Sequence, residues 1–147
     1  MRMMLIELRP AALTEKPLGE LVRHLTEAVA GRARVAIDLN LDGDCTLPPE
    51  VQVALYRIVQ EALNNIAKHA GADRVSVSLC WRPQRAALEI SDDGCGFKLD
   101  DVLPDRFGLG IMRERAQSIG AVLDITSGPG KGTRIAVNWQ NKEEVTA

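Results

Sequence analysis

The clearest hydrophobic pattern in the chain is the helical one of residues 51–67. Apolar side chains follow the pair Pro48-Pro49 at positions 51, 54, 55, 58, 59, 62, 63, 66 and 67. Alternating gaps of three and one place these side chains on one face of a helix, and proline is favoured at the first helical position. We therefore expect a long helix from Pro49 to about Ala70 that ends at Gly71, since glycine is common directly after a helix.

The remaining segments switch between helical spacing and the strict alternation of strands. Helical spacing predicts a helix over 18–30 with Gly31 as its end, and a shorter helix over 109–119 capped by Gly120. Alternation and turn residues predict strands at 34–41, 74–81, 85–91, 121–127 and 133–139. This order of elements predicts a single α+β domain, a two-layer sandwich with the helices on one face of a sheet.

Composition and charge exclude several classes of function. The 147 residues are 46% hydrophobic and 26% charged, as in ordinary soluble globular domains. Eighteen Lys and Arg against 20 Asp and Glu leave a net charge of −2, so no excess positive charge is available to bind nucleic acid or an anionic membrane. With 3% aromatic residues, the chain also lacks platforms for base stacking.

The cysteines and the start of the chain indicate a cytoplasmic setting. Three cysteines without a Cys-x-x-Cys pair fit neither a disulfide framework nor a zinc site. Glu7 interrupts the apolar start too early for a signal peptide. No stretch reaches the roughly 18–20 apolar residues of a membrane span.

Glycine is concentrated in one quarter of the chain. Eight of the 12 glycines are at positions 94, 96, 108, 110, 120, 128, 130 and 132. Glycines at this density either form tight turns or let the backbone approach a ligand closely. A P-loop does not fit, because Gly130-Lys131-Gly132 leads into a predicted strand and not a helix. A dinucleotide fingerprint does not fit either, because Arg113 occupies the place of its third glycine.

Two groups of polar residues could carry chemistry. At 100° per residue, Glu61, Asn65 and Lys68 fall within an arc of about 60° beside the apolar stripe of the long helix. Carboxylate and amide oxygens suit Mg²⁺, and a lysine suits phosphate, although for such a trio taken alone a solvated polar face is the more common explanation. His69 projects toward the apolar side and is interpreted as a core or helix-end histidine.

The second group is the run Asp92-Asp93-Gly94-Cys95-Gly96 at the end of an apolar strand. A strand-end acid before Gly-x-Gly can accept hydrogen bonds from a ligand that lies against the glycine backbone. A tight acidic turn is the alternative interpretation of the same residues.

Taken together and in order, these motifs resemble those of the GHKL superfamily of gyrase, chaperone, histidine-kinase and mismatch-repair ATPases. Residues 61–70 resemble the N box, 92–97 the G1 box, and 107–116 the G2 box with its helix. The resemblance is closest to the catalytic domain of sensor histidine kinases of the nitrate/nitrite-sensor and degradative-enzyme-sensor type. Residues 8–13 are similar to the segment that joins phosphoacceptor helices to such a domain.

The resemblance implies a Bergerat-type fold, a mixed sheet backed by helices, that binds ATP and Mg²⁺. In it Asp92 would accept from the adenine amino group, with Thr133 supporting it through water. Asn65 would hold Mg²⁺, Lys68 would neutralise the phosphates, and Glu61 would act as a general base or organise the magnesium shell. Further nucleotide contacts are implied for Gly94, Gly96, Gly108, Leu109 and Gly110, and residues 97–107 are implied to form a lid.

The implied activity is that of a histidine kinase catalytic domain, residues 17–147, preceded by a linker over 1–16 from a dimerisation and phosphoacceptor domain. The acceptor histidine is expected on that other domain, because neither His24 nor His69 has an adjacent acid. A response regulator is the implied downstream partner. No nucleic-acid partner and no direct membrane contact are expected, and the isolated domain is expected to be a monomer.

Two other readings remain open at this point. One is a stand-alone GHKL serine kinase of the anti-sigma-factor type, which acts as a partner-binding switch. The segment 8–10 and the helix residues Arg113–Ala116 favour the histidine kinase over it. The other is a non-catalytic nucleotide-binding module, against which the presence of Glu61, Asn65 and Asp92 argues.

Overall fold

The computed structural model of the chain describes residues 16–43, 46–96 and 109–141, and for residues 69–70 the backbone alone. Its elements are α2 (Leu18–Ala33), β1 (Ala36–Asp42), α3 (Pro49–Asn65), the π-helical turn η2 (Ile66–Ala70), β2 (Arg74–Arg82), β3 (Arg85–Asp92), α4 (Leu109–Ser118), β4 (Val122–Ser127) and β5 (Thr133–Gln140). All but the last residue of the implied linker (1–16), the whole of the implied lid (97–107) and Gly108 lie outside the described residues.

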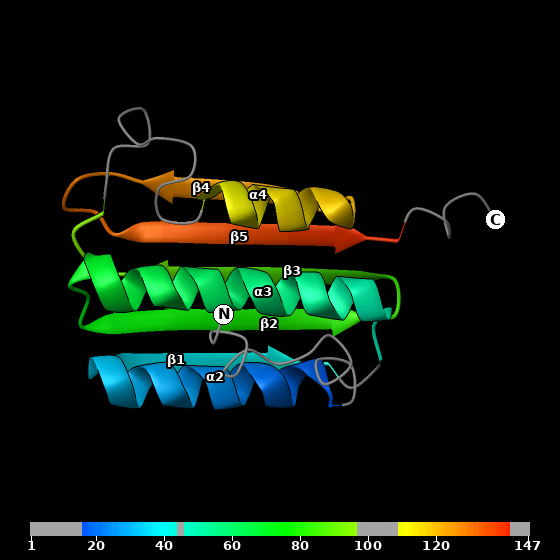
Figure 1. Cartoon of the computed structure of the whole chain (residues 1–147), viewed down its shortest axis with the longest axis horizontal. Helices are drawn as coiled ribbons and strands as arrows, with labels where there is room; N and C mark the ends of the chain where they lie inside the picture. Colours follow the sequence, from blue (N-terminus) through cyan, green and yellow to red (C-terminus); the bar gives the residue numbers. More distant parts are fainter. Residues whose placement is uncertain (1–15, 44–45, 97–108, 142–147) are drawn as a thin grey trace, which may run out of the picture.

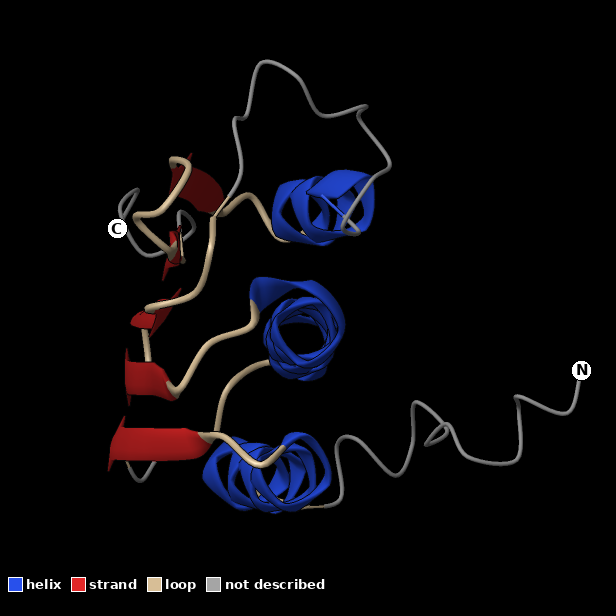
Figure 2. Ribbon diagram, turned by 90° about the vertical axis from the view of Figure 1, so that its left-hand side faces the viewer, coloured by secondary structure: helices blue, strands red, loops and turns tan. Residues whose placement is uncertain are grey.

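The strands form one sheet in the order β1-β2-β3-β5-β4. β1 pairs with β2 in parallel, whereas β2–β3, β3–β5 and β4–β5 are antiparallel. The described helices all lie on one face of this mixed sheet, α2 beside β1, α3 in the middle and α4 beside β4 and β5 (Figure 1). Figure 2 shows the two layers edge-on, which confirms the predicted α+β sandwich.

The hydrophobic core lies between the sheet and α3. The apolar stripe of α3 is buried, with Leu55, Ile58, Val59 and Leu63 each at most 1% exposed. Alternate residues of β2, β3 and β5 face the helices and are buried: Val75, Val77, Leu79, Trp81, Ala86, Leu88, Ile90, Ile135, Val137 and Trp139. α3 also packs against both α2 and α4, so it is the central support of the fold.

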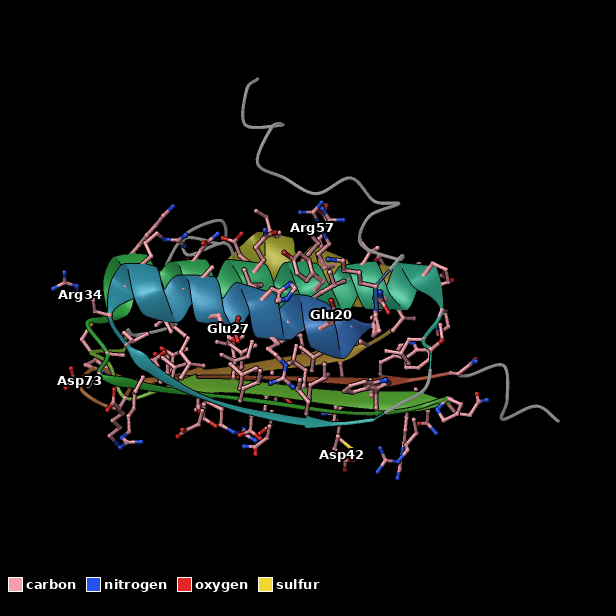
Figure 3. The ribbon with its side chains drawn as sticks, turned by 90° about the horizontal axis from the view of Figure 1, so that it is seen from below. Glu20, Glu27, Arg34, Asp42, Arg57 and Asp73 are labelled. Atoms are coloured by element: carbon pink, nitrogen blue, oxygen red, sulfur yellow. The ribbon has the colours of Figure 1, made fainter. Side chains whose placement is uncertain are left out.

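The other face of the sheet carries polar side chains. Figure 3 shows them projecting away from the helices, Asp42 among them. Exposed ion pairs join neighbouring strands there, Arg74 with Asp38 at 3.6 Å and Arg82 with Asp42 at 3.3 Å. Pairs of this kind contribute little to stability, so the face is a solvated surface.

The end of α2 differs from the prediction. Gly31 does not end the helix, which continues to Ala33 and is followed by Arg34 in the left-handed conformation (φ 58°). Glycine inside a helix costs about 1 kcal/mol. The extra turn offsets this cost because Ala33 packs against the hydrophobic core. The strand after it therefore starts at Ala36 and not at residue 34.

The end of the long helix also differs. α3 is α-helical only to Asn65, and residues 66–70 form a π turn with wider hydrogen-bonded rings. Gly71 (φ 60°) and Gly120 (φ 71°) do stand at the ends of η2 and α4, as predicted. None of the described helices is long and apolar enough to cross a membrane.

Candidate functional site

Several of the predicted site residues lie at one end of the sheet. β3 ends there at Asp92, β5 begins there at Thr133, and β2 begins there at Arg74. η2 ends beside the same edge, which is the left-hand end in Figure 1. Because β3 is antiparallel to both β2 and β5, its last residue lies opposite the first residues of its neighbours.

Asp92 presents a half-buried carboxylate at this edge. Its Oδ1 accepts a hydrogen bond of 2.8 Å from the amide of Gly94, which turns the chain sharply after the strand. Burial raises the pKa of Asp92 above its ordinary value, and the neighbouring Asp93 adds to the rise, while the amides of Gly94 and Thr133 oppose it. A partly desolvated carboxylate in a fixed orientation is a strong acceptor for a donor group of a ligand.

Thr133 lies beside Asp92, although 41 positions separate them in the sequence. The two residues are directly paired across β3 and β5. The Thr133 hydroxyl lies 2.9 Å from the hydroxyl of Ser127, which is also 3.1 Å from the carbonyl oxygen of Gly132. The pairing of strands thus brings together the two residues that were expected to bind an adenine base.

The glycines near Asp92 serve close packing between two loops. Gly132 (φ 73°) leaves no room for a side chain, because a Cβ atom there would overlap the carbonyl oxygen of Asp92. Gly96 (φ 64°) is similarly closed by the carbonyl oxygen of Gly128. The amide of Gly130 donates to the carbonyl of Cys95 at 2.7 Å. The loop after β3 therefore rests on the turn between β4 and β5.

Asp93 is a residue to which the sequence assigned no role. Its Oδ1 accepts hydrogen bonds from the amides of Asp73 (2.9 Å) and Arg74 (3.1 Å). These two bonds hold the pKa of Asp93 below its ordinary value, which is the opposite of the shift at Asp92. The only signal in the sequence was a second acid directly after the strand-end acid.

The polar edge of α3 is partly preserved. Glu61 and Asn65 are half-buried and one α-helical turn apart, as predicted. Lys68 is exposed and lies in η2, where the 100° spacing of an α-helix no longer applies, so the 60° arc calculated for the three residues does not describe its direction. The predicted direction of His69 lies outside the described side chains.

Leu109 begins α4, and its side chain is only 6% exposed and belongs to the hydrophobic core. The nucleotide contact expected of Leu109 stays a prediction, and a contact made through its backbone would leave the side chain in the core. Gly110 beside it is half-buried.

Two cavities of about 460 and 440 Å³ lie at the opposite end of the sheet. The first is lined by Arg82, Arg85 and Gln140, and the second by Pro48, Ser118 and Trp139, among others. Neither is lined by a predicted site residue. The sequence motifs point to the carboxylate of Asp92 and its partners, and not to either cavity.

Comparison with known proteins agrees with the motifs. "Sensor histidine kinase LiaS" of Bacillus subtilis is 38% identical over 137 residues, which make up 93% of this chain and 38% of LiaS. "Sensor protein VraS" of Staphylococcus saprophyticus is 36% identical over 148 residues, 100% of this chain and 42% of VraS. The chain thus spans about two fifths of the length of these relatives.

A solved structure has the same fold. The histidine kinase domain of the blue-light activated histidine kinase EL346 from Erythrobacter litoralis has a TM-score of 0.68 and 29% sequence identity, and the match covers 88% of this chain and 64% of that one. A family model, "Histidine kinase-, DNA gyrase B-, and HSP90-like ATPase", matches residues 50–143, well over half of the chain. The resemblance drawn from the motifs is confirmed, and the chain belongs to this ATPase family.

Proposed function

We propose that the chain is the ATP-binding catalytic domain of a sensor histidine kinase, which transfers the γ-phosphoryl group of ATP to a histidine of a separate dimerisation domain. The observation that carries the proposal is the oriented carboxylate of Asp92 beside Thr133, at the sheet edge that η2 also reaches. The similarity to sensor kinases along nearly the whole chain supports it.

Asp92 would select the base. Its free acceptor capacity suits the amino group of adenine, whereas guanine presents a carbonyl oxygen at the corresponding position. Loss of a charged acceptor costs about 1.5–3 kcal/mol, so Asp92→Ala should weaken ATP binding roughly ten- to a hundredfold. Calorimetric titration measures this, with Asp124→Ala on the exposed face of β4 as a matched control. Equal ATP affinity of Asp92→Ala and wild type would remove Asp92 from the site.

Asn65 and Lys68 would bind the phosphate end. The donor set suits Mg²⁺, since Asn65 offers an amide oxygen and Glu61 a carboxylate one turn away. Among the described residues no three His, Cys, Asp or Glu side chains gather in a metal-binding cluster. Magnesium is usually bound through one or two carboxylates, with substrate phosphates and water as further ligands. Bound Mg²⁺ would neutralise the charge that develops during phosphoryl transfer.

Lys68 would add a positive point charge for the phosphates, and its exposure leaves it able to turn toward them. Glu61 would either take the proton of the attacking group or hold the water shell of the metal. Backbone at Gly94, Gly96, Gly108 and Gly110 would pass along the nucleotide. Phosphoryl transfer depends mainly on such positioning and charge, and needs no covalent help from the protein.

The acceptor histidine would come from another domain. His24 is exposed on α2, which lies beside the edge strand β1, whereas α3 covers the middle of the sheet (Figure 1). In-line transfer needs the imidazole nitrogen within about 3–3.5 Å of the phosphorus. The 147 residues incubated with radiolabelled Mg·ATP should therefore form no acid-labile phosphohistidine.

Addition of the matching dimerisation domain should restore labelling, weakly, because the effective concentration of a tethered domain is lost. Label on the isolated chain that disappears in His24→Ala or His69→Ala would contradict the assignment. Residues 1–16 would be the linker to that domain, and a response regulator would receive the phosphoryl group from it. We place the domain in the cytoplasm, as a monomer when isolated.

A further inference from the structure

The side chain of Asp93, directly after β3, is bound to Asp73 and Arg74, which lie 20 and 19 positions earlier in the sequence. Its Oδ1 accepts from the amides of Asp73 and Arg74 at 2.9 and 3.1 Å. The amide of Asp93 in turn donates to the carbonyl oxygen of Arg74 at 3.3 Å. Three hydrogen bonds thus hold Asp93 against Asp73 and Arg74 at the start of β2.

The segment held by Asp93 is the exit of η2. Only Gly71, Ala72 and Asp73 lie between the end of the π turn and β2. Gly71 reverses the chain in the left-handed conformation, and Ala72 is buried at 9% exposure. The carbonyl of Asp73 also accepts from the amide of Ala36 in β1 at 3.1 Å. Figure 3 shows Asp73 at the left-hand end of the molecule, where this segment turns into the sheet.

The position of Asp92 does not depend on these hydrogen bonds of Asp93. It is paired in the sheet with Val75 on one side and with Thr133 on the other, and Gly94 holds its carboxylate. The π turn is not part of the sheet, and its last residues are joined to the sheet through the three-residue segment that Asp93 holds. The loss of Asp93 should therefore loosen η2 while the base acceptor stays in place.

We propose that Asp93 is a positioning residue that fixes the phosphate-binding end of η2 relative to the base-binding carboxylate of Asp92, and so couples phosphate binding to base binding. This rests on the proposed function, because Asp92 and Lys68 are taken as its base and phosphate contacts. Asp93 contributes no reacting group. Its Oδ1 accepts hydrogen bonds from two backbone amides and so fixes the position of the segment that carries them.

The test compares three variants in the 147-residue chain. Asp93→Ala removes the acceptor, Asp93→Glu keeps the charge but moves the carboxylate outward by one methylene, and Asp93→Asn keeps an oxygen atom at the same position. The affinities for adenosine and for Mg·ADP are measured by calorimetry, and the melting temperature is recorded for each variant. The readout is the ratio of the two affinities, which a general loss of structure would not change selectively.

We expect Asp93→Ala and Asp93→Glu to weaken Mg·ADP binding about tenfold and to leave adenosine binding within about twofold of wild type, as the loss of one or two hydrogen bonds to a charged acceptor allows. Asp93→Asn should stay within about twofold of wild type for both ligands. If Asp93→Ala does not fold, the contrast between Asp93→Glu and Asp93→Asn decides alone.

Proportional losses for both ligands, or none for either, would overturn the positioning role while leaving the proposed function intact. A loss in Asp93→Asn as large as that in Asp93→Glu would overturn it too. Wild-type chain that binds neither adenosine nor Mg·ADP would instead remove the proposed function, and with it this inference.

Discussion

The two ends of the sheet are held together by different kinds of contact. At the end that carries Asp92, backbone meets backbone: Gly132 and Gly96 allow carbonyl oxygens to lie where a side chain would stand. At the opposite end, an aromatic side chain packs against backbone. The ring of Trp81 is 5% exposed and packs against the glycine backbone at Gly19, where a Cβ atom would lie 3.2 Å from the ring.

This difference explains how the fold can support a site at one end. Packing of a large side chain tolerates small adjustments, because its cost rises gradually with the volume that is lost. Backbone contacts allow almost no adjustment, since a single added carbon must displace a carbonyl group. The end that carries the proposed base-binding carboxylate is therefore held by glycine contacts and hydrogen bonds, whereas the other end contains the packing around Trp81.

The largest effect on stability is expected at the aromatic end. Trp81→Ala should lower the free energy of unfolding by about 3–5 kcal/mol, the usual range for loss of a buried aromatic side chain. The affinity of the remaining folded protein for Mg·ADP should be unchanged, because Trp81 lies at the far end of β2 from Arg74. Urea unfolding and calorimetry measure the two quantities, and a parallel loss of affinity would contradict the separation of the two ends.

A smaller effect on stability but a larger effect on binding is expected for Gly132→Ala. The new Cβ adds overpacking against Asp92 and an unfavourable positive φ, together about 3 kcal/mol, and pushes the base acceptor out of place. Gly130→Ala is the matched control, since its φ is also positive (75°) but nothing lies within 4 Å of the added carbon. It should cost only about 1 kcal/mol. Similar losses in both variants would show that φ alone matters here.

Asn65→Ala should separate metal binding from folding. Asn65 is half-buried beside the buried stripe of α3, so its truncation should change the melting temperature by no more than about 3 °C. Its proposed role predicts a fall of about tenfold in Mg·ATP affinity, with adenosine affinity unchanged. Calorimetry with and without Mg²⁺ checks this. A collapse of the melting temperature without nucleotide would make Asn65 a structural residue.

The smallest expected effect is a gain in stability from Asp92→Asn. The pKa of Asp92 is raised in the folded chain, so its favourable contribution is present below the unfolded pKa and is lost as the pH rises through the folded pKa. Removal of the charge should therefore raise the melting temperature at pH 7 by about 1–3 °C, a small amount because water screens a half-exposed group.

The gain from Asp92→Asn should disappear near pH 3, below the ordinary pKa of about 3.9, where both proteins are uncharged at this position. Thermal melts at the two pH values measure it. A variant that is less stable than wild type at pH 7 would mean that the bond from Gly94 outweighs the cost of burial.

Local patterns in the sequence were enough to predict the elements and the family. The spacing of apolar residues in α3 and the alternation in the strands are local properties, so they predicted three helices and five strands. The observed ends lie within three residues of the expected ones, except that α3 ends five residues early, at Asn65, where η2 follows. The ordered motifs at residues 61–70, 92–97 and 107–116 led to the same superfamily that the family model matches. The individual ligand roles stay predictions.

Which residues meet at the sheet edge depends on the pairing of strands in the folded chain. Thr133 lies opposite Asp92 because of the register between β3 and β5, and Asp93 meets Asp73 because β2 starts beside the end of β3. The π turn and the continuation of α2 past Gly31 were likewise decided by packing, since local spacing predicted an α-helix in one case and an end in the other. Periodicity along a chain reports which face of an element is buried, whereas the pairing of distant backbones depends on contacts that no local pattern contains.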